Sequence, residues 1–209
     1  IKFGQIIGFA TADIRVGEHI HTHNCGVHDF SRDYHFAEAA QPEKVLPEES
    51  RMTFQGFRRP NGKVGTRNYI GILTSVNCSA SVARFIADEF NRSGILDDFP
   101  HIDGVVPFVQ GSGCGMAGKG SEGFEVMQRT EWGYANHPNI VGSLMVGLGC
   151  EVMQIPGLIE DYGLKENEMF RTMTIQATGG TRKTIERGVA MIKEMLPQAN
   201  NVRREPVPV

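Results

Sequence analysis

The sequence predicts an α/β protein, with a parallel Rossmann-like sheet and crossover helices preceded by part of a small β domain. Two observations carry this prediction. After about residue 68, short apolar segments of β character alternate with longer amphipathic segments, which is typical of a parallel sheet whose strands are joined by helices. The first 24 residues, in contrast, contain only short β-like stretches.

The N-terminal stretch is expected to be only part of a domain. Residues 1–24 contain two predicted strands, KFGQIIGFA and GEHIHTHN, joined by a turn at Val16-Gly17. So small a piece cannot bury a core alone. Residues 25–50 are polar and contain Pro42 and Pro47, which indicates a linker.

Residues 51–209 are predicted to form the α/β domain, which begins with a hairpin around Asn61-Gly62. The following strands are predicted in YIGILTSV, GVVPFV, IVGSLMVGL and MFRTMTIQ. The helices between and after them are predicted in SASVARFIADEFN, EGFEVMQRTEWGYA, Cys150 to Tyr162 and TRKTIERGVAMIKEML. The tail NNVRREPVPV is expected to be an extended connection.

Composition limits the partners. The formal net charge of -3 provides no surplus of cations for a phosphate backbone, so nucleic acid is not expected. No run approaches the roughly 18 apolar residues of a membrane span, so we expect a cytoplasmic protein. Four cysteines in 209 residues are too few for a disulfide scaffold. The expected partner is a small molecule, with the chain acting as a homo-oligomer.

Three cysteines follow three predicted strands. Cys78, Cys114 and Cys150 are spaced by 36 residues each, about one strand-helix unit. The carboxyl ends of parallel strands meet at one edge of a sheet, and a helix expected just beyond each cysteine would favour thiolate. This pattern suits a metal site with soft thiolate ligands, or three cysteines of an iron-sulfur cluster that leaves one iron open as a Lewis acid. The alternative is that the cysteines are small buried core residues.

A glycine-rich loop lies between a predicted strand and a predicted helix. Such loops, here Gly111 to Gly120, bind phosphates or other anions. Neither nucleotide motif is complete, because the hydroxyl that a P-loop needs comes one place late at Ser121, and Met116 replaces the third glycine of a dinucleotide fingerprint. The alternative is a loop whose glycines allow sharp turns.

Three histidines alternate in GEHIHTHN. In a strand, His19, His21 and His23 would project from one face, where two could hold a metal and a third could transfer protons. The alternative is a polar face on an exposed edge strand.

Cations gather within ten residues at Arg58, Arg59, Lys63 and Arg67, followed by Asn68. Arginine binds a carboxylate with two hydrogen bonds, and Asn68 could bond hydroxyl groups. The alternative is ordinary solvated charge on the hairpin.

Four separated segments resemble the altronate and galactarate dehydratase family of sugar-acid lyases: KFGQIIGFATADIRVGEHIHTHN, GFRRPNGKVGTRNYIGILTSVNCSA, VQGSGCGM and HPNIVGSLMVGLGCEVMQI. The HIHTHN segment is more similar to the altronate type. The resemblance implies loss of water from a sugar acid such as D-altronate to give a 2-keto-3-deoxy acid, with Fe²⁺ or another divalent metal. It also implies that residues 1–24 are the second half of a SAF-type domain, shared with antifreeze-like proteins, and that the family continues past Val209. We therefore expect a fragment, and its activity alone stays open.

The combined hypothesis assigns a role to each candidate residue. Iron held by Cys78, Cys114 and Cys150 binds the substrate, and His21 or His23 moves protons. The residues predicted to contact substrate are His19, Asn24, Arg67, Asn68, Gly113 and Gly115. Two alternatives remain, a nucleotide- or phosphate-binding module using the Gly111–Gly120 loop and a non-catalytic fragment of a larger enzyme.

Overall fold

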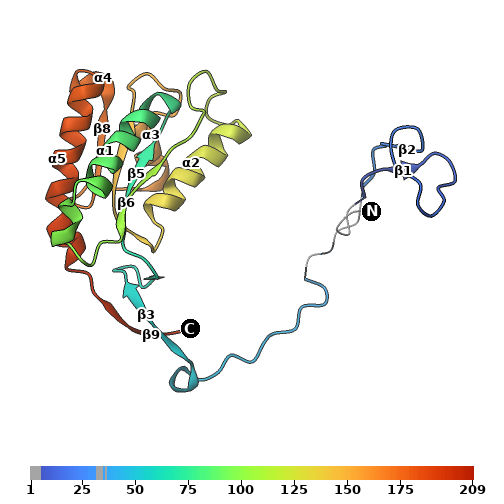
Figure 1. The fold of residues 1–209 in the computed structure, drawn as a ribbon, viewed down its shortest axis with the longest axis horizontal. Helices are drawn as coiled ribbons and strands as arrows, with labels where there is room; N and C mark the ends of the chain where they lie inside the picture. Colours follow the sequence, from blue (N-terminus) through green and yellow to red (C-terminus); the bar gives the residue numbers. More distant parts are fainter. Residues whose placement is uncertain (1–5, 32–34, 36) are drawn as a thin grey trace. The chain divides into compact units, whose positions relative to one another are not determined.

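The computed structural model describes residues 6–31, 35 and 37–209, and the chain divides into two units, Ile1–Val45 and Leu46–Val209 (Figure 1). No helix among the described residues is long and apolar enough to cross a membrane.

The larger unit contains a four-stranded sheet in which every strand is parallel to its neighbours. The strand order is β6-β5-β7-β8. The bounds are Tyr69–Thr74 for β5, Gly104–Phe108 for β6, Ile140–Gly147 for β7 and Phe170–Thr174 for β8. This topology confirms the predicted fold class. The chain moves outward from β5 to β6, crosses back to β7 and continues to β8, so the strand order reverses between β5 and β7.

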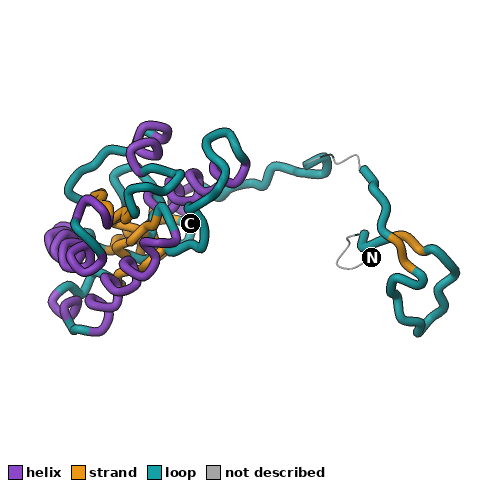
Figure 2. The backbone as a smooth tube through the Cα atoms, turned by 90° about the horizontal axis from the view of Figure 1, so that it is seen from above, coloured by secondary structure: helices purple, strands orange, loops and turns teal. Residues whose placement is uncertain are grey.

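Helices cover both faces of this sheet (Figures 1 and 2). On one face lie α1 (Ala80–Arg92) and α5 (Thr181–Asn200), and on the other lie α2 (Glu122–Ala135) and α3 (Ile155–Tyr162), while a short α4 (Ile175–Thr178) follows β8.

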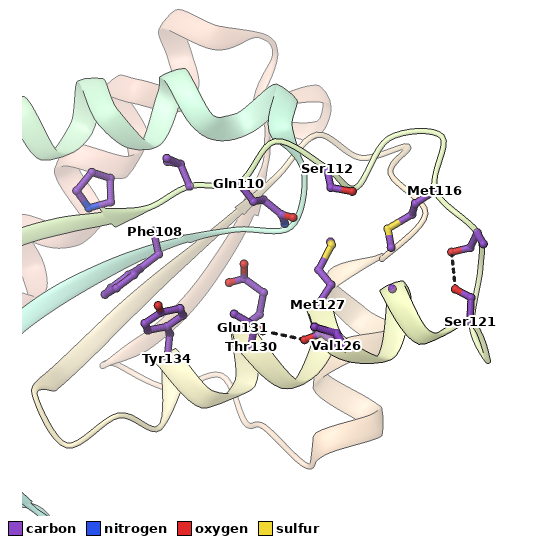
Figure 3. A pocket seen from close by; sticks show the side chains of 14 residues that line it. Phe108, Gln110, Ser112, Met116, Ser121, Val126, Met127, Thr130, Glu131 and Tyr134 are labelled. Carbon is purple, nitrogen blue, oxygen red and sulfur yellow. Dashed lines mark hydrogen bonds between the residues drawn. The ribbon is translucent and has the colours of Figure 1, made fainter. Parts of the chain in front are cut away.

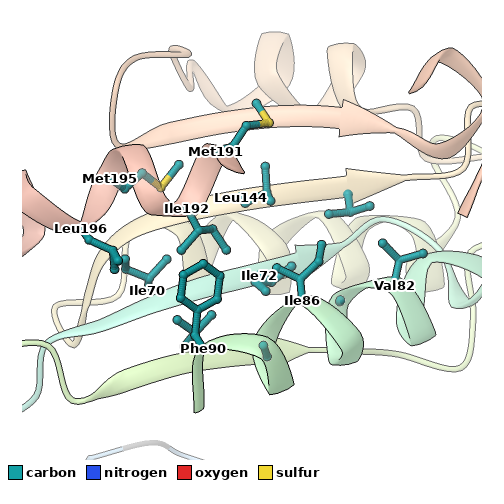
Figure 4. Packing of buried hydrophobic residues seen from close by; sticks show 14 of the residues in the cluster. Ile70, Ile72, Val82, Ile86, Phe90, Leu144, Met191, Ile192, Met195 and Leu196 are labelled. Atoms are coloured by element: carbon teal, nitrogen blue, oxygen red, sulfur yellow. The ribbon is translucent and has the colours of Figure 1, made fainter. Parts of the chain in front are cut away.

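Alternate strand residues account for the two layers. Ile70, Ile72 and Leu144 pack with α1 and α5 (Figure 4), whereas Leu73 and Met145 pack with α3. Because side chains of a strand point alternately to opposite faces, one apolar run fills two cores.

A second sheet has the order β4-β3-β9, with bounds Thr53–Arg58 for β3, Val64–Gly65 for β4 and Arg204–Pro208 for β9. The pairing of β3 with β4 confirms the predicted hairpin. The tail is not an unpaired connection, because β9 pairs antiparallel with β3 over five residues. Its prolines are tolerated because β9 is an edge strand.

The smaller unit has one short antiparallel pair, β1 (Phe9–Ala10) with β2 (Cys25–Gly26). The prediction of a strand in GEHIHTHN is wrong, because His19 to Asn24 form a loop and turn. The backbone bends there, with the amides of Asn24 and Cys25 both donating to the carbonyl of His21. Of the predicted strand KFGQIIGFA, residues 2–5 lie outside the described residues, and in the described part only Phe9–Ala10 is β-structure.

Candidate functional site

The three cysteine loops lie at one edge of the parallel sheet. Cys114 follows β6, Cys78 follows β5 and Cys150 follows β7, three strands that are neighbours in the order β6-β5-β7. Cys78 and Cys150 flank the position where the strand order reverses. In open α/β sheets this reversal opens a crevice at the carboxyl ends of the strands, where ligands bind.

Backbone hydrogen bonds tie these three loops together. The amide of Asn77 donates to the carbonyl of Ser112 over 2.7 Å, and the amide of Val152 donates to the carbonyl of Gly113 over 3.2 Å. The glycine loop is thus bonded to both loops that flank the reversal, and the cysteines belong to one connected surface.

The cysteines are free thiols and exposed to solvent. The alternative that they are buried core residues is therefore wrong for all three. The Cys78 sulfur lies 3.5 Å from Asn77 Oδ1, and Gln176 Nε2 donates to the Cys150 sulfur over 3.4 Å.

The expected helix beyond each cysteine is present only at Cys78, which precedes α1 directly. Cys114 lies in the glycine loop well before α2, and the predicted helix from Cys150 starts only at Ile155, where Pro156 occupies the first turn. Since helix dipoles act within about one turn, Cys78 is the one of these three cysteines that lies next to a helix start.

The donor set is only partly suited to a metal. Three exposed sulfurs on neighbouring loops are chemically suited to iron. Within residues 6–31, 35 and 37–209, however, no three side chains of His, Cys, Asp or Glu lie close enough to hold one ion. The thiols share the predicted edge without gathering around one point, so their joint binding of iron stays a prediction.

A buried carboxylate supports the Cys150 loop, and our sequence analysis missed it. Glu151 is 4% exposed and accepts hydrogen bonds from Ser75 Oγ at 2.6 Å and from the amides of Leu148 and Gly149 at 3.2 and 2.5 Å. Gly147 leaves room for this carboxylate, because an added Cβ would lie 2.2 Å from Glu151 Oε1. The available signal was an acidic residue next to a cysteine at the end of a buried strand.

The glycine loop needs its glycines for shape. Gly113 has φ +95°, and a Cβ there would lie 2.6 Å from the carbonyl oxygen of Ser75. Gly115 has φ +69° but open space around it. The two side chains that a P-loop would use are engaged elsewhere: Lys119 pairs with Asp161 at 2.5 Å, and Ser121 caps α2 by accepting from the amide of Phe124. The hydrogen bond between them raises the pKa of Lys119 and lowers the pKa of Asp161.

In the smaller unit, Asn24 organises the histidine loop. Its side chain is 6% exposed, accepts from the His21 amide at 2.9 Å and donates to the His19 carbonyl at 3.1 Å. The rings of His19 and His21 lie 5.4 Å apart. His23 is exposed in the turn. The predicted strand is absent, but the imidazoles of His19 and His21 are still neighbours. The side chain of Asn24 holds their loop and is already hydrogen-bonded within it.

Arg67 and Asn68 lie at the opposite edge of the sheet from the cysteines. Asn68 precedes β5, whereas Cys78 follows it, a separation of roughly 20 Å for a six-residue strand. Asn68 is fully buried: its Oδ1 accepts from Arg59, and its Nδ2 donates to the carbonyls of His101 and Ala199. Arg67 Nη1 lies 3.4 Å from Asp103 Oδ1. The geometry therefore does not support the expectation that Arg67 and Asn68 orient a substrate held at the cysteines.

Comparison with known proteins identifies relatives of both units. Residues 56–200 match the family described as D-galactarate dehydratase/altronate hydrolase, second domain, and residues 1–28 match the altronate/galactarate dehydratase SAF domain. The chain is 31% identical over 212 residues to altronate dehydratase of Bacillus subtilis, covering 100% of this chain and 40% of that protein. It is 32% identical over 208 residues to altronate dehydratase of Escherichia coli, covering 99% and 40%. Galactarate dehydratase (L-threo-forming) of Escherichia coli is 30% identical over 155 residues, 74% of this chain and 29% of that protein. The chain thus spans about 40% of the length of the two altronate dehydratases.

Proposed function

The chain belongs to the D-galactarate dehydratase/altronate hydrolase family, and from this premise we propose that it contributes the cysteine-bearing part of a hydro-lyase. The proposed reaction removes water from a sugar acid such as D-altronate and gives a 2-keto-3-deoxy acid. The observation that carries the proposal is the position of three exposed thiols on neighbouring loops at the carboxyl edge of β6, β5 and β7.

The chemistry explains why such a site is needed. The proton next to a carboxylate is weakly acidic, so its removal requires a base and a positive group that stabilises the developing negative charge. Cys78, Cys114 and Cys150 would hold iron, which would supply that positive charge as a Lewis acid. Because the thiols do not surround one point, the loops would have to close on the ion.

The other candidate residues also have proposed roles. His21 and His23 are proposed to move protons, and His19 contributes the neighbouring imidazole. Gly113 and Gly115, which flank Cys114, are proposed to contact the substrate. Asn24 supports the histidine loop through bonds to His19 and His21. Assembly as a homo-oligomer remains a prediction.

The test uses protein purified without air, followed by measurement of bound iron. D-altronate and galactarate are then supplied separately, and the keto acid formed is measured. The assay is run on the 209-residue chain and on a protein in which this chain replaces the matching part of the Bacillus subtilis relative. Activity in the second protein alone indicates that the chain works only as part of the longer enzyme.

Cysteine variants test whether the three exposed thiols hold iron and support dehydration. Cys78→Ser, Cys114→Ser or Cys150→Ser is expected to lower both iron content and dehydration at least tenfold. The matched control is Cys25→Ser, which changes a thiol of the smaller unit. Unchanged iron and activity in all three variants would overturn the proposal.

Binding of phosphate or nucleotide at the Gly111–Gly120 loop is less well supported. Lys119 and Ser121 are already engaged with Asp161 and the start of α2. Tight binding of ATP or NAD by the same protein would support nucleotide binding at this loop.

A further inference from the structure

A cavity of about 710 Å³ lies between α2 and the strand and loop that run from β6 toward Cys114 (Figure 3). Its wall is mainly apolar and includes Phe108, Val126 and Met127. The rings of Phe108 and Tyr134 stack with centroids 4.2 Å apart and an angle of 28° between their planes. This pair gives the cavity a flat aromatic wall.

Glu131 of α2 points into this cavity, toward the chain segment that carries Gln110 (Figure 3). The residue is only 5% exposed, and among the described residues its Oε2 has no hydrogen-bond partner. A buried carboxyl oxygen without a partner is unfavourable, and most such groups in native proteins are satisfied. A partner for this oxygen must come from outside the described part of the chain, such as a water molecule or an atom of a bound ligand.

The cavity is poorly suited to the proposed sugar-acid substrate. A sugar acid carries a carboxylate and many hydroxyl groups, which require several polar partners. Gln110, Ser112 and Thr130 also line the cavity, but most of its wall is apolar, and a second carboxylate next to Glu131 would be repelled when Glu131 is ionised. The ligand of this cavity therefore belongs to a different chemical class.

We propose that this cavity binds a small planar organic cation, an amidinium or guanidinium group on a flat apolar body. After a rotation of the Glu131 side chain that brings the buried Oε2 to the cavity, the cation's two N–H groups would donate to its two oxygens, as in paired arginine and carboxylate groups. Its flat body would lie against the Phe108–Tyr134 pair, where aromatic faces attract cations. This inference is independent of the proposed dehydratase activity.

The site makes a specific prediction about pH. Burial raises the pKa of Glu131 to about 8, so the carboxyl group is mostly neutral at pH 6. A cation prefers the ionised form, so binding releases a proton, whereas an amidinium stays charged throughout this range. The ionised fraction rises from about 1% at pH 6 to about one half at pH 8, so the Kd falls about 50-fold.

Other ionisable groups near α2 do not replace Glu131 in this role. Tyr134 lies on α2 itself and also lines the cavity. From α3, Asp161 is bonded to Lys119 and Gln128, and Tyr162 lies against Trp132. β5 contributes Tyr69 as its ionisable residue, and β7 contributes none.

Three probes of the same shape test the proposal: benzamidine, benzamide and benzoate, which are respectively cationic, neutral and anionic. Binding to the 209-residue chain is measured by calorimetry at pH 6, 7 and 8. Benzamidine is expected to bind at least tenfold more tightly than the other two at pH 8. Measurement in two buffers with different heats of ionisation reports the proton released.

Glu131→Gln is expected to weaken benzamidine binding at least tenfold and to remove its pH dependence. The matched control is Glu122→Gln, which removes the same charge from an exposed position of the same helix and should have little effect. Tyr134→Leu is expected to weaken binding severalfold while the pH dependence remains.

Equal binding of benzamide and benzamidine, or benzamidine binding without proton release, would overturn the proposal. So would the absence of binding by all three probes. If Glu131→Gln does not fold, two measurements still test whether the cavity binds the cation. These are proton release on binding to the unchanged chain and the affinity of the Tyr134→Leu variant.

Discussion

The two edges of the parallel sheet are both rich in polar side chains, yet they differ in how those groups are bonded. At the amino edge, Asn68 is buried and every hydrogen-bonding atom of its side chain has a partner in the chain. At the carboxyl edge, Cys78, Cys114 and Cys150 are exposed. At the amino edge, the side chain of Asn68 therefore stabilises the fold. At the carboxyl edge, the three thiols are available to a ligand.

The amino edge also illustrates how a buried cation can be structural. Arg59 is 8% exposed and donates to the Pro138 carbonyl, to Asn68 Oδ1 and to the Arg67 carbonyl. Burial lowers its pKa. Its guanidinium joins the hairpin to the start of β5 and to the start of β7, and it is not open to a carboxylate ligand.

The largest expected effect tests the amino edge. Asn68→Ala would leave the Arg59 guanidinium and the carbonyls of His101 and Ala199 without this partner. Unsatisfied buried groups cost about 1 to 3 kcal/mol each, so we expect a loss of about 4 kcal/mol in the free energy of unfolding. Urea unfolding measures it, with Asn201→Ala at an exposed position as the control. A loss below about 1 kcal/mol would remove the distinction between the edges.

Glu131 extends the comparison to a buried carboxyl group whose Oε2 has no hydrogen-bond partner in the part of the chain that the structure describes. Its pKa is raised from 4.5 to about 8, so the folded state binds a proton that the unfolded state has lost. Stability is therefore expected to fall by about 3 kcal/mol as pH rises from 5 to 8. Thermal or urea unfolding at several pH values measures this slope, and Glu131→Gln is expected to flatten it.

The matched control is again Glu122→Gln, which should keep the slope of the unchanged chain. A slope of the opposite sign, with stability rising over the same pH interval, would show that Glu131 is ionised and paired in the folded protein.

Asn68 and Glu131 also show how much could be predicted from the sequence. The sheet and its helices were predictable because apolar strands and amphipathic helices differ in period and alternate regularly. The roles of Asn68 and Glu131 were not, because burial and the completion of hydrogen bonds depend on residues far away in the chain. Asn68 is bonded to Ala199, and Glu131 lies beside the loop that follows β6.

Local patterns misled in two other places. The alternating histidines have the period of a strand, but the side chain of Asn24 bonds to the backbone at both His19 and His21 and stabilises a turn. The tail REPVP contains two prolines that argue against a strand, yet β3 offers an edge where β9 can pair. In the first case a side chain a few residues away stabilises a turn, and in the second a strand far away in the sequence provides the pairing edge.

A smaller effect tests how the carboxyl edge is supported. The carboxylate of Glu151 accepts from Ser75 and Leu148 at Oε1 and from Gly149 at Oε2, and Glu151→Gln replaces one of these oxygens by an NH₂ group facing donors. We expect a loss of about 2 kcal/mol in stability and faster labelling of Cys150 by a thiol reagent, because its loop loses support. Cys78 serves as the internal reference for labelling, and Glu168→Gln at an exposed position is the control variant. Unchanged labelling of Cys150 would indicate that the loop is held by other contacts.

The smallest expected effect concerns the histidine loop, where an asparagine again uses its side chain inside the fold. Asn24→Ala removes the bonds to the His21 amide and the His19 carbonyl, which we expect to reduce local stability by about 1 kcal/mol. Amide exchange measures the loss, and the NMR shifts of the His19 and His21 rings report whether they separate. Thr22→Ala, which removes only the hydroxyl near His21 Nδ1, is the milder comparison. If both variants leave amide exchange unchanged, Asn24 does not hold the loop and its side chain becomes available for the substrate contact predicted from the sequence.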